Sequence, residues 1–227
     1  VEPVSAKIID DNLLYLSQEI YRTIEKYPVK TKSELEEYKC YLYMVLLTAH
    51  RIGEVCNLTK EDCYIQHKKI ISPKKITKTS EESEFPIPDE CMEYIKSVEK
   101  GKLFPNIKRA SVYLMFQRLL RISNIELRKD KILTIHNTRN LMLNIMIQNG
   151  IDSRLADSCL DHKPHGTIKN YLEFSFKQKK EAFEKYWTLV RNDELLIQKE
   201  EFRKEFFKNF ELEFEKEWKK KIKRLKE

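Results

Sequence analysis

Several side chains of this sequence are of the types that can break and reseal a phosphodiester bond without a metal ion or a nucleotide. The transition state of that reaction carries charge on two non-bridging phosphate oxygens, and the guanidinium groups of Arg51 and Arg139 can each donate paired hydrogen bonds to them. The phenol of Tyr171 can attack the phosphorus and store the energy of the bond in a covalent ester. Each residue type alone is common on surfaces or in cores, so the hypothesis depends on their combination.

Two histidines can assist this reaction. His136 precedes Arg139 by three residues on the same face of a predicted helix, where it can share a phosphate with the arginine or take the proton of the phenol. His162 can add a further hydrogen bond to the same phosphate. A metal-dependent nuclease with the two histidines as ligands is the weaker hypothesis, because no carboxylate cluster accompanies them at ligand spacing. The sequence therefore predicts no metal site and no cofactor.

A lysine can supply the proton that the departing sugar hydroxyl needs. Lys78 lies in a predicted turn between two strands, and a flexible ammonium group at a hairpin tip can reach into a groove. Lys74 and Lys75 are alternatives for this role. We prefer Lys78 because it directly precedes the turn into the strand that contains Phe85.

The elements that must position these side chains are mostly helices. Apolar residues from Leu13 to Ile24 recur at helical spacing and stop before Pro28. Ser33 followed by Glu36 has the form of a capping box and predicts the start of a second helix. Further helices are predicted from Asp89, from Ser111, from His136 to about Asn149, from Asp152, and in a short segment after Pro164.

Three β-prone runs separate the second helix region from the later helices. They cover residues 63–65, 69–71 and 84–88, and charged turns separate them, which is typical of a small antiparallel sheet. The predicted fold class is therefore mainly α with a small antiparallel β-sheet (α+β).

The end of the chain differs from the rest. We expect residues 1–175 to form the catalytic domain, with residues 1–11 as a lead-in from an N-terminal domain, and residues 176–227 to form a helical tail. An apolar stripe recurs every four residues in this tail, and either the chain's own domain or a neighbouring protomer must cover it. The stripe consists of Phe202, Phe206, Phe210, Phe214, Trp218 and Ile222.

The charge of the chain is concentrated in one central block. The sequence has 43 Lys and Arg against 36 Asp and Glu, and residues 100–139 alone hold 10 basic and 2 acidic residues. A surface that contacts phosphates would produce this excess, and so would a solvated lysine-rich surface. The candidate contacts to a DNA backbone are Arg109, Arg118, Arg121 and Lys129.

The composition excludes several classes of protein. A chain of 227 residues with 41% hydrophobic residues, 4 Gly and 7 Pro is neither disordered nor collagen-like. No uncharged apolar run approaches the roughly 18 to 20 residues of a membrane span, and no signal peptide is recognisable. The 5 cysteines include no Cys-x-x-Cys pair, which argues against disulfides and zinc alike. We therefore expect a cytoplasmic protein.

The order and spacing of the candidate residues resemble the catalytic domain of the tyrosine recombinases, the phage integrase family. Thr48, Arg51 and Glu54 resemble the family's Thr-Gly-x-Arg-x-x-Glu motif, with Glu54 in a supporting role. The sequence Ile76-Thr77-Lys78-Thr79, followed by Phe85-Pro86-Ile87-Pro88, resembles its lysine turn and the strand behind it.

The later motifs continue the resemblance, which runs from about Asn12 to Phe174. The stretch His136-Asn137-Thr138-Arg139 resembles the third motif, and Leu160-Asp161-His162 resembles Leu-Gly-His. Tyr171 follows at the family's spacing for the nucleophile.

Three residues depart from the family pattern. Ala49 replaces the usual glycine, Asn140 stands where many members have a second histidine, and Asp161 replaces the glycine before His162. A carboxylate beside a phosphate-binding histidine would raise the pKa of that histidine and repel DNA. We therefore expect Asp161 either to point away from the phosphate or to lower activity until the enzyme assembles.

The resemblance implies a site-specific DNA recombinase. Such enzymes cleave double-stranded DNA through a 3′-phosphotyrosyl intermediate, act as homotetramers on two DNA sites, and commonly donate a C-terminal helix to the next protomer. It implies integration or transposition of a mobile element in the cytoplasm, at the nucleoid. Alternatives are chromosome-dimer resolution by a Xer-type recombinase, a type IB topoisomerase or telomere resolvase, and a catalytically silent DNA-binding or assembly homologue.

Overall fold

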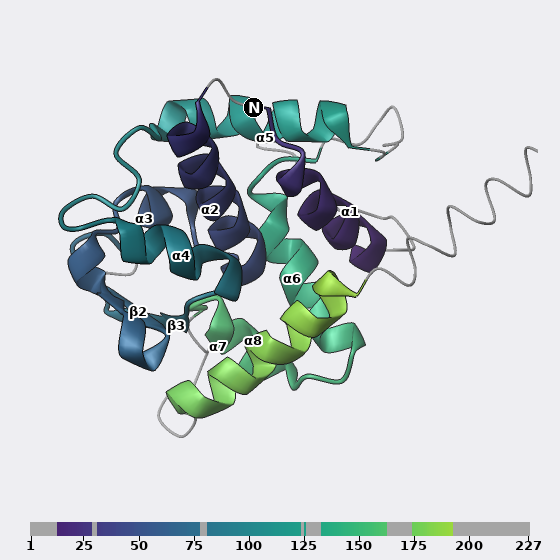
Figure 1. Ribbon diagram of the computed structural model, residues 1–227. Helices are drawn as coiled ribbons and strands as arrows, with labels where there is room; N and C mark the ends of the chain where they lie inside the picture. Colours follow the sequence, from purple (N-terminus) through teal and green to yellow (C-terminus); the bar gives the residue numbers. More distant parts are fainter. Residues whose placement is uncertain are drawn as a thin grey trace, which may run out of the picture. The chain divides into compact units, whose positions relative to one another are not determined.

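The structure is a computed structural model that describes residues 13–28, 31–77, 81–123, 125, 133–162 and 174–192. The chain divides into two units, Val1–Arg191 and Asn192–Glu227. Helices and one three-stranded antiparallel sheet make up the described part of the first unit, so the predicted fold class is confirmed (Figure 1). Within the described residues, no helix combines the length and the apolar character that a bilayer crossing requires.

The first helices carry the segment in which Arg51 lies. Helix α1 (Leu13–Glu25) ends before Pro28, as predicted, and α2 (Lys32–Thr48) follows it. The predicted capping box at Ser33 is wrong, because the hydroxyl of Thr31 accepts the hydrogen bond of the Glu34 N–H at 3.3 Å and the helix begins two residues earlier. The short helix α3 (Ile52–Cys56) comes directly after Arg51.

The sheet joins three short strands in chain order. These are β1 (Cys63–Tyr64), β2 (Lys69–Ser72) and β3 (Ser83–Pro86), with the 3₁₀ turns η1 (Lys60–Asp62) and η2 (Ile65–His67) beside β1. Ile70 pairs with Phe85, and both side chains are buried on the same face of the sheet. The antiparallel sheet that the sequence predicted is therefore confirmed.

The remaining helices begin close to the predicted positions. They are α4 (Asp89–Ser97), α5 (Arg109–Ile122), α6 (Asn137–Gln148), α7 (Ser153–Cys159) and α8 (Phe176–Arg191). Asp152 caps α7 by accepting the N–H groups of Arg154 and Leu155 at 3.0 and 3.3 Å, as predicted. Asp89 is the first helical residue of α4 rather than its cap, and α5 begins two residues before Ser111.

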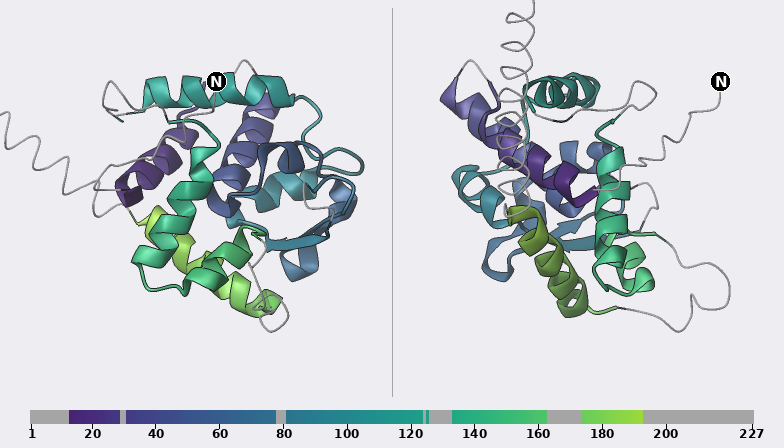
Figure 2. Two further views of the ribbon diagram at one scale, coloured as in Figure 1. Left: turned by 180° about the vertical axis from the view of Figure 1, so that it is seen from behind. Right: turned by 90° about the vertical axis from the view of Figure 1, so that its right-hand side faces the viewer.

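Helix α8 lies beside α1, α6 and α7 in both sets of views (Figures 1 and 2). Its side chains Phe183, Tyr186 and Trp187 are buried in the core. The indole of Trp187 donates a hydrogen bond of 2.7 Å to the carbonyl of Leu47, and the hydroxyl of Tyr186 donates one of 3.2 Å to that of Leu46. The helix at the start of the expected tail therefore belongs to the first unit. The apolar stripe from Phe202 to Ile222 lies outside the described residues.

Candidate active site

Arg51 sits between two helices that fix its backbone. Helix α2 ends at Ala49, whose backbone is left-handed (φ 53°), and Arg51 is the N-cap of α3. Glu54 in the first turn of α3 accepts the Arg51 N–H at 3.4 Å and the Arg51 Nη1 at 3.0 Å. The buried Glu54 carboxylate therefore holds both the main chain and the guanidinium of Arg51, which is the supporting role that the sequence analysis assigned to it.

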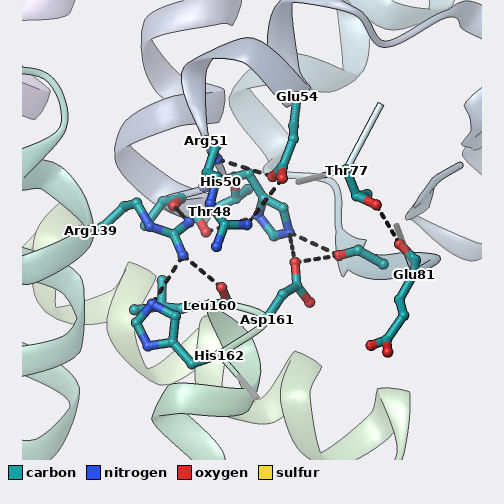
Figure 3. A network of polar contacts seen from close by, with 12 residues as sticks. Thr48, His50, Arg51, Glu54, Thr77, Glu81, Arg139, Leu160, Asp161 and His162 are labelled. Atoms are coloured by element: carbon teal, nitrogen blue, oxygen red, sulfur yellow. Dashed lines mark hydrogen bonds and ion pairs between the residues drawn. The ribbon is translucent and has the colours of Figure 1, made fainter. Parts of the chain in front are cut away.

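Arg139 on α6 is buried, with only 6% of its surface exposed. Its guanidinium donates to the main-chain carbonyl of Ala49 and, at 2.7 Å, to that of Leu160 (Figure 3). Burial and, second, the positive charge of Arg51 lower the pKa of the guanidinium from 12.5 to about 10, against the opposing charges of Glu54 and Asp161. Two cationic groups that repel each other in a buried site form a binding site for an anion such as a phosphate.

His162 completes the cluster around Arg139. Its Nε2 lies 3.2 Å from Nη2 of Arg139, and its Nδ1 lies 2.9 Å from a carboxylate oxygen of Asp157. Because a guanidinium only donates, Nε2 must accept, and the ring then carries its proton on Nδ1 and donates it to Asp157. The ring is 41% exposed, so it can also reach a ligand.

His136 lies one helical turn before Arg139, at the N-cap of α6, where it is exposed. The backbone therefore places His136 and Arg139 one turn apart, as the predicted helix does. The structure brings Arg51, Arg139 and His162 together at one place. Lys78 and Tyr171 lie outside the described residues.

Thr77 and Glu81 flank residues 78–80, which include Lys78. Thr77 is nearly buried, and its hydroxyl oxygen lies 2.6 Å from the carbonyl oxygen of Glu81 and 3.2 Å from that of Lys74 (Figure 3). A hydroxyl has one proton to donate, and the shorter distance favours the carbonyl of Glu81 as its acceptor. Thr77 was not singled out as a site residue from the sequence.

The candidate DNA contacts that the structure describes are exposed on α5. They are Arg109, Arg118 and Arg121, while Lys129 lies outside the described residues. The guanidinium of Arg109 packs against Gly53 of α3, 3.7 Å from the position of a Cβ atom there. This end of the basic helix therefore lies beside the helix that follows Arg51.

The sequence analysis missed His50 as a site residue. His50 is buried at 2% exposure and stacks on Phe85 of β3, with ring centroids 3.6 Å apart. Its Nε2 lies 3.1 Å from the carboxylate of Asp161, which also accepts the hydroxyl of Ser83 at 2.5 Å. The only signal in the sequence was that a histidine occupies the variable position of the first motif while an aspartate replaces a glycine of the fourth.

Asp161 turns toward His50, away from the ring of His162 (Figure 3). The carboxylate is therefore held by His50 and Ser83 rather than by His162. Its backbone keeps the left-handed conformation that favours glycine, with φ at 54°. Burial alone would raise the pKa of its carboxyl, but the hydrogen bond and charge of His50, the hydroxyl of Ser83 and the charge of Lys179 outweigh burial and lower the pKa to about 2.

The described part of the chain holds no group of three or more His, Cys, Asp or Glu side chains arranged to hold a metal ion. All five cysteines lie in the described part and are free thiols, as their spacing predicted.

Comparison with known proteins gives one match. Residues 15–178 match the family model described as the phage integrase family. A search of curated proteins finds no match. The matched segment covers most of the chain and contains Arg51, Arg139 and His162, which the fold brings together. The chain belongs to the phage integrase family, the tyrosine recombinases.

Proposed function

We propose that this chain cuts and rejoins DNA strands through a covalent bond between Tyr171 and a 3′ phosphate. Family membership supports a tyrosine recombinase function in general. The observation that carries the specific proposal is the convergence of Arg51, Arg139 and His162, because two guanidiniums and an imidazole at one point match the charge of a phosphoryl transition state.

The proposed reaction balances without an external reagent. The phenol oxygen of Tyr171 attacks phosphorus and gives its proton to a base, for which His136 is the candidate. The bond from phosphorus to the 5′ oxygen breaks, and that oxygen takes a proton from Lys78. Attack by a 5′ hydroxyl on the phosphotyrosyl bond reverses these steps and reseals a strand. Arg51 and Arg139 stabilise the same charged transition state in both directions.

Covalent capture tests this proposal. A library of DNA duplexes with a randomised central segment and one nick is incubated with the protein and EDTA, and adducts that survive denaturation are sequenced. We expect a recurring DNA sequence and a peptide that carries the nucleotide at Tyr171. The adduct should be lost in Tyr171→Phe and kept in Tyr64→Phe, a matched change at an exposed tyrosine of β1. Bound DNA without an adduct would overturn the proposal and favour a silent DNA-binding homologue.

We also propose that the enzyme assembles as a tetramer on two DNA sites and that the tail docks on a neighbouring protomer. The apolar stripe of the tail supports this, because an apolar helix face of this size is stable when it packs against another protein surface. Replacing Phe206 and Phe210 with lysine should abolish cooperative assembly in a gel-shift titration while leaving binding to a single site. Unchanged cooperativity would contradict the docking.

For the biological pathway we propose integration or transposition of a mobile element, a role supported by membership of the phage integrase family. The DNA sequence recovered by covalent capture is placed on two separate plasmids and, in a second assay, twice on one plasmid. Joining of the separate plasmids is the expected product. Reaction only between sites on one plasmid would favour dimer resolution, and relaxation of supercoils without a second site would favour a topoisomerase.

A further inference from the structure

His50 and Asp161 belong to the two turns that hold Arg139. The carbonyl of Ala49, directly before His50, and the carbonyl of Leu160, directly before Asp161, both accept hydrogen bonds from the Arg139 guanidinium. The His50 and Asp161 side chains then join the same two turns a second time, at 3.1 Å. The result is a closed ring of contacts, in which the distance between the two turns is set by the His50–Asp161 pair on one side and by Arg139 on the other.

The residues that follow the pair are those that face the phosphate. Arg51 comes directly after His50, and His162 comes directly after Asp161. A shift of one turn relative to the other would therefore move Arg51 away from His162. It would also lengthen the hydrogen bonds that Arg139 donates to the two turns. Displacements of about 1 Å at a reacting centre can cost about 100-fold in rate.

The acceptors beside His50 determine which of its ring nitrogens carry a proton. Its Nδ1 lies 3.1 Å from the carbonyl oxygen of Thr48 and its Nε2 lies 3.1 Å from a carboxylate oxygen of Asp161. A carbonyl and a carboxylate both only accept, so both ring nitrogens must donate, and the imidazole is the charged, doubly protonated form. Ser83 on β3 contacts both members of the pair, because its hydroxyl donates to the same carboxylate oxygen and its oxygen lies 3.3 Å from Nε2 of His50.

Three charged groups and one hydroxyl surround the Asp161 carboxylate, and they come from four parts of the fold. The Asp161 carboxylate faces His50 from the loop after α2, Ser83 from β3, Lys179 from α8 and Arg139 from α6. The negative charge of Asp161 offsets part of the repulsion between Arg139 and Arg51. A glycine at this position would supply neither that charge nor the bond to His50.

We propose that His50 and Asp161 form a charged positioning pair that sets the spacing of Arg51, Arg139 and His162 for phosphoryl transfer. This inference rests on the proposed strand cleavage and adds two residues to the machinery of the reaction. Neither residue touches the phosphate in this proposal. Both act through the turns that they hold.

The kinetic test uses the nicked duplex recovered by covalent capture. The rate of adduct formation is measured in a single turnover at saturating duplex, and the Kd for the same duplex is measured by fluorescence anisotropy. We expect His50→Leu and Asp161→Asn each to slow adduct formation at least 10-fold while Kd changes less than 3-fold. The double variant should be no slower than either single variant, because one interaction is lost only once.

Two further variants separate positioning from folding. His50→Gln keeps a donor that can reach Asp161 and should restore the rate to within about 5-fold of the original protein, although its ring stacking is lost. His67→Leu removes an exposed histidine of η2 and should leave the rate unchanged. Multiplicative losses in the double variant, or equal losses in His50→Gln and His50→Leu, would overturn the proposal.

A measurement without DNA tests the His50–Asp161 pair independently of the proposed strand cleavage. Nitrogen-15 NMR of the histidine rings at neutral pH should show His50 protonated on both nitrogens, and Asp161→Asn should remove one of these protons and shift the His162 resonances. If the unaltered protein forms no adduct, the function fails while this result still supports the pair. A singly protonated His50, or His162 resonances unmoved in Asp161→Asn, would overturn the pairing whatever the kinetics show.

Discussion

Replacing Arg139 with lysine should make the stability of the folded protein depend on pH between about pH 8 and pH 10. Arg139 is buried and lies close enough to Arg51 for the two charges to repel. The guanidinium keeps its charge because arginine is such a weak acid, and it spans the carbonyls of Ala49 and Leu160. A lysine ammonium in the same place meets the same burial and the same repulsion, but it loses its proton far more easily.

The expected size follows from the environment of Arg139. Its pKa falls from 12.5 to about 10 because of burial and of Arg51. A pKa difference of that size corresponds to about 3 kcal/mol. This is the free energy by which the folded protein disfavours a positive charge at this position. An ordinary lysine titrates at about pH 10.4, so the same environment would favour the neutral amine in the folded state from about pH 8 upward. The unfolded chain stays charged over that range, so the stability of the variant rises with pH.

The measurement is the free energy of unfolding in urea at several values between pH 7 and pH 10, for the variant and for the unaltered protein. At pH 7 the lysine also leaves one of the two carbonyls without a donor, which lowers the stability of Arg139→Lys by about 1 to 3 kcal/mol. The difference in the free energy of unfolding between Arg139→Lys and the unaltered protein should shrink by about 2 kcal/mol or more as pH rises. Tyrosines and cysteines titrate in both proteins and cancel in the difference.

Arg121→Lys is the matched control, since Arg121 is exposed on α5. Its difference from the unaltered protein should stay near zero at every pH. A deficit of Arg139→Lys that is constant across the range would refute the reasoning, because it would mean that the site does not penalise a positive charge. Adduct formation by Arg139→Lys should be slower by about 100-fold or more, since one ammonium group cannot replace the paired donors of a guanidinium.

The remaining predictions concern the metal, the cap of α7, the anchor of α8 and the salt dependence. EDTA should leave the rate of adduct formation unchanged, and a loss that added magnesium restores would contradict the metal-free mechanism. Asp152→Ala should lower the free energy of unfolding by about 1 kcal/mol, measured in urea, because two N–H groups lose their acceptor. Trp187→Phe should lower it by about 1 to 3 kcal/mol, because the carbonyl of Leu47 loses its donor. The Kd for duplex DNA should rise steeply with salt, and Arg121→Gln should reduce the slope of its logarithmic plot by about 0.9 if this arginine contacts a phosphate.

Much of the fold could be predicted because its helices and strands have clear local patterns. The apolar spacing of residues 13–24 and the β-prone runs of β2 and β3 are properties of short windows of sequence. The errors fell at helix starts, where neighbouring residues compete for the same N–H groups. Thr31 and Ser33 are both good caps, and only the path of the chain before α2 decides between them.

The site was predictable where the family motifs name residue types and was not predictable where it depends on pairing across the fold. Arg51, Arg139 and His162 could be found from their order and spacing. The pairing of His50 with Asp161 joins two turns far apart in the sequence, and neither residue alone suggests it. The two left-handed turns at Ala49 and Asp161 are not evident from these residue types, and only the glycines of the family pattern at both positions point to them.

The last turn of α2 depends on residues from a much later part of the chain. A helix leaves its final carbonyls without partners of its own, and here Tyr186 and Trp187 of α8 donate to those of Leu46 and Leu47. During synthesis the ribosome releases Tyr171 before it releases α8. The scaffold that holds Arg51 is therefore completed only after Tyr171 has been made, and a nascent chain that stops short of Trp187 already contains this tyrosine while the last turn of α2 still lacks its partners.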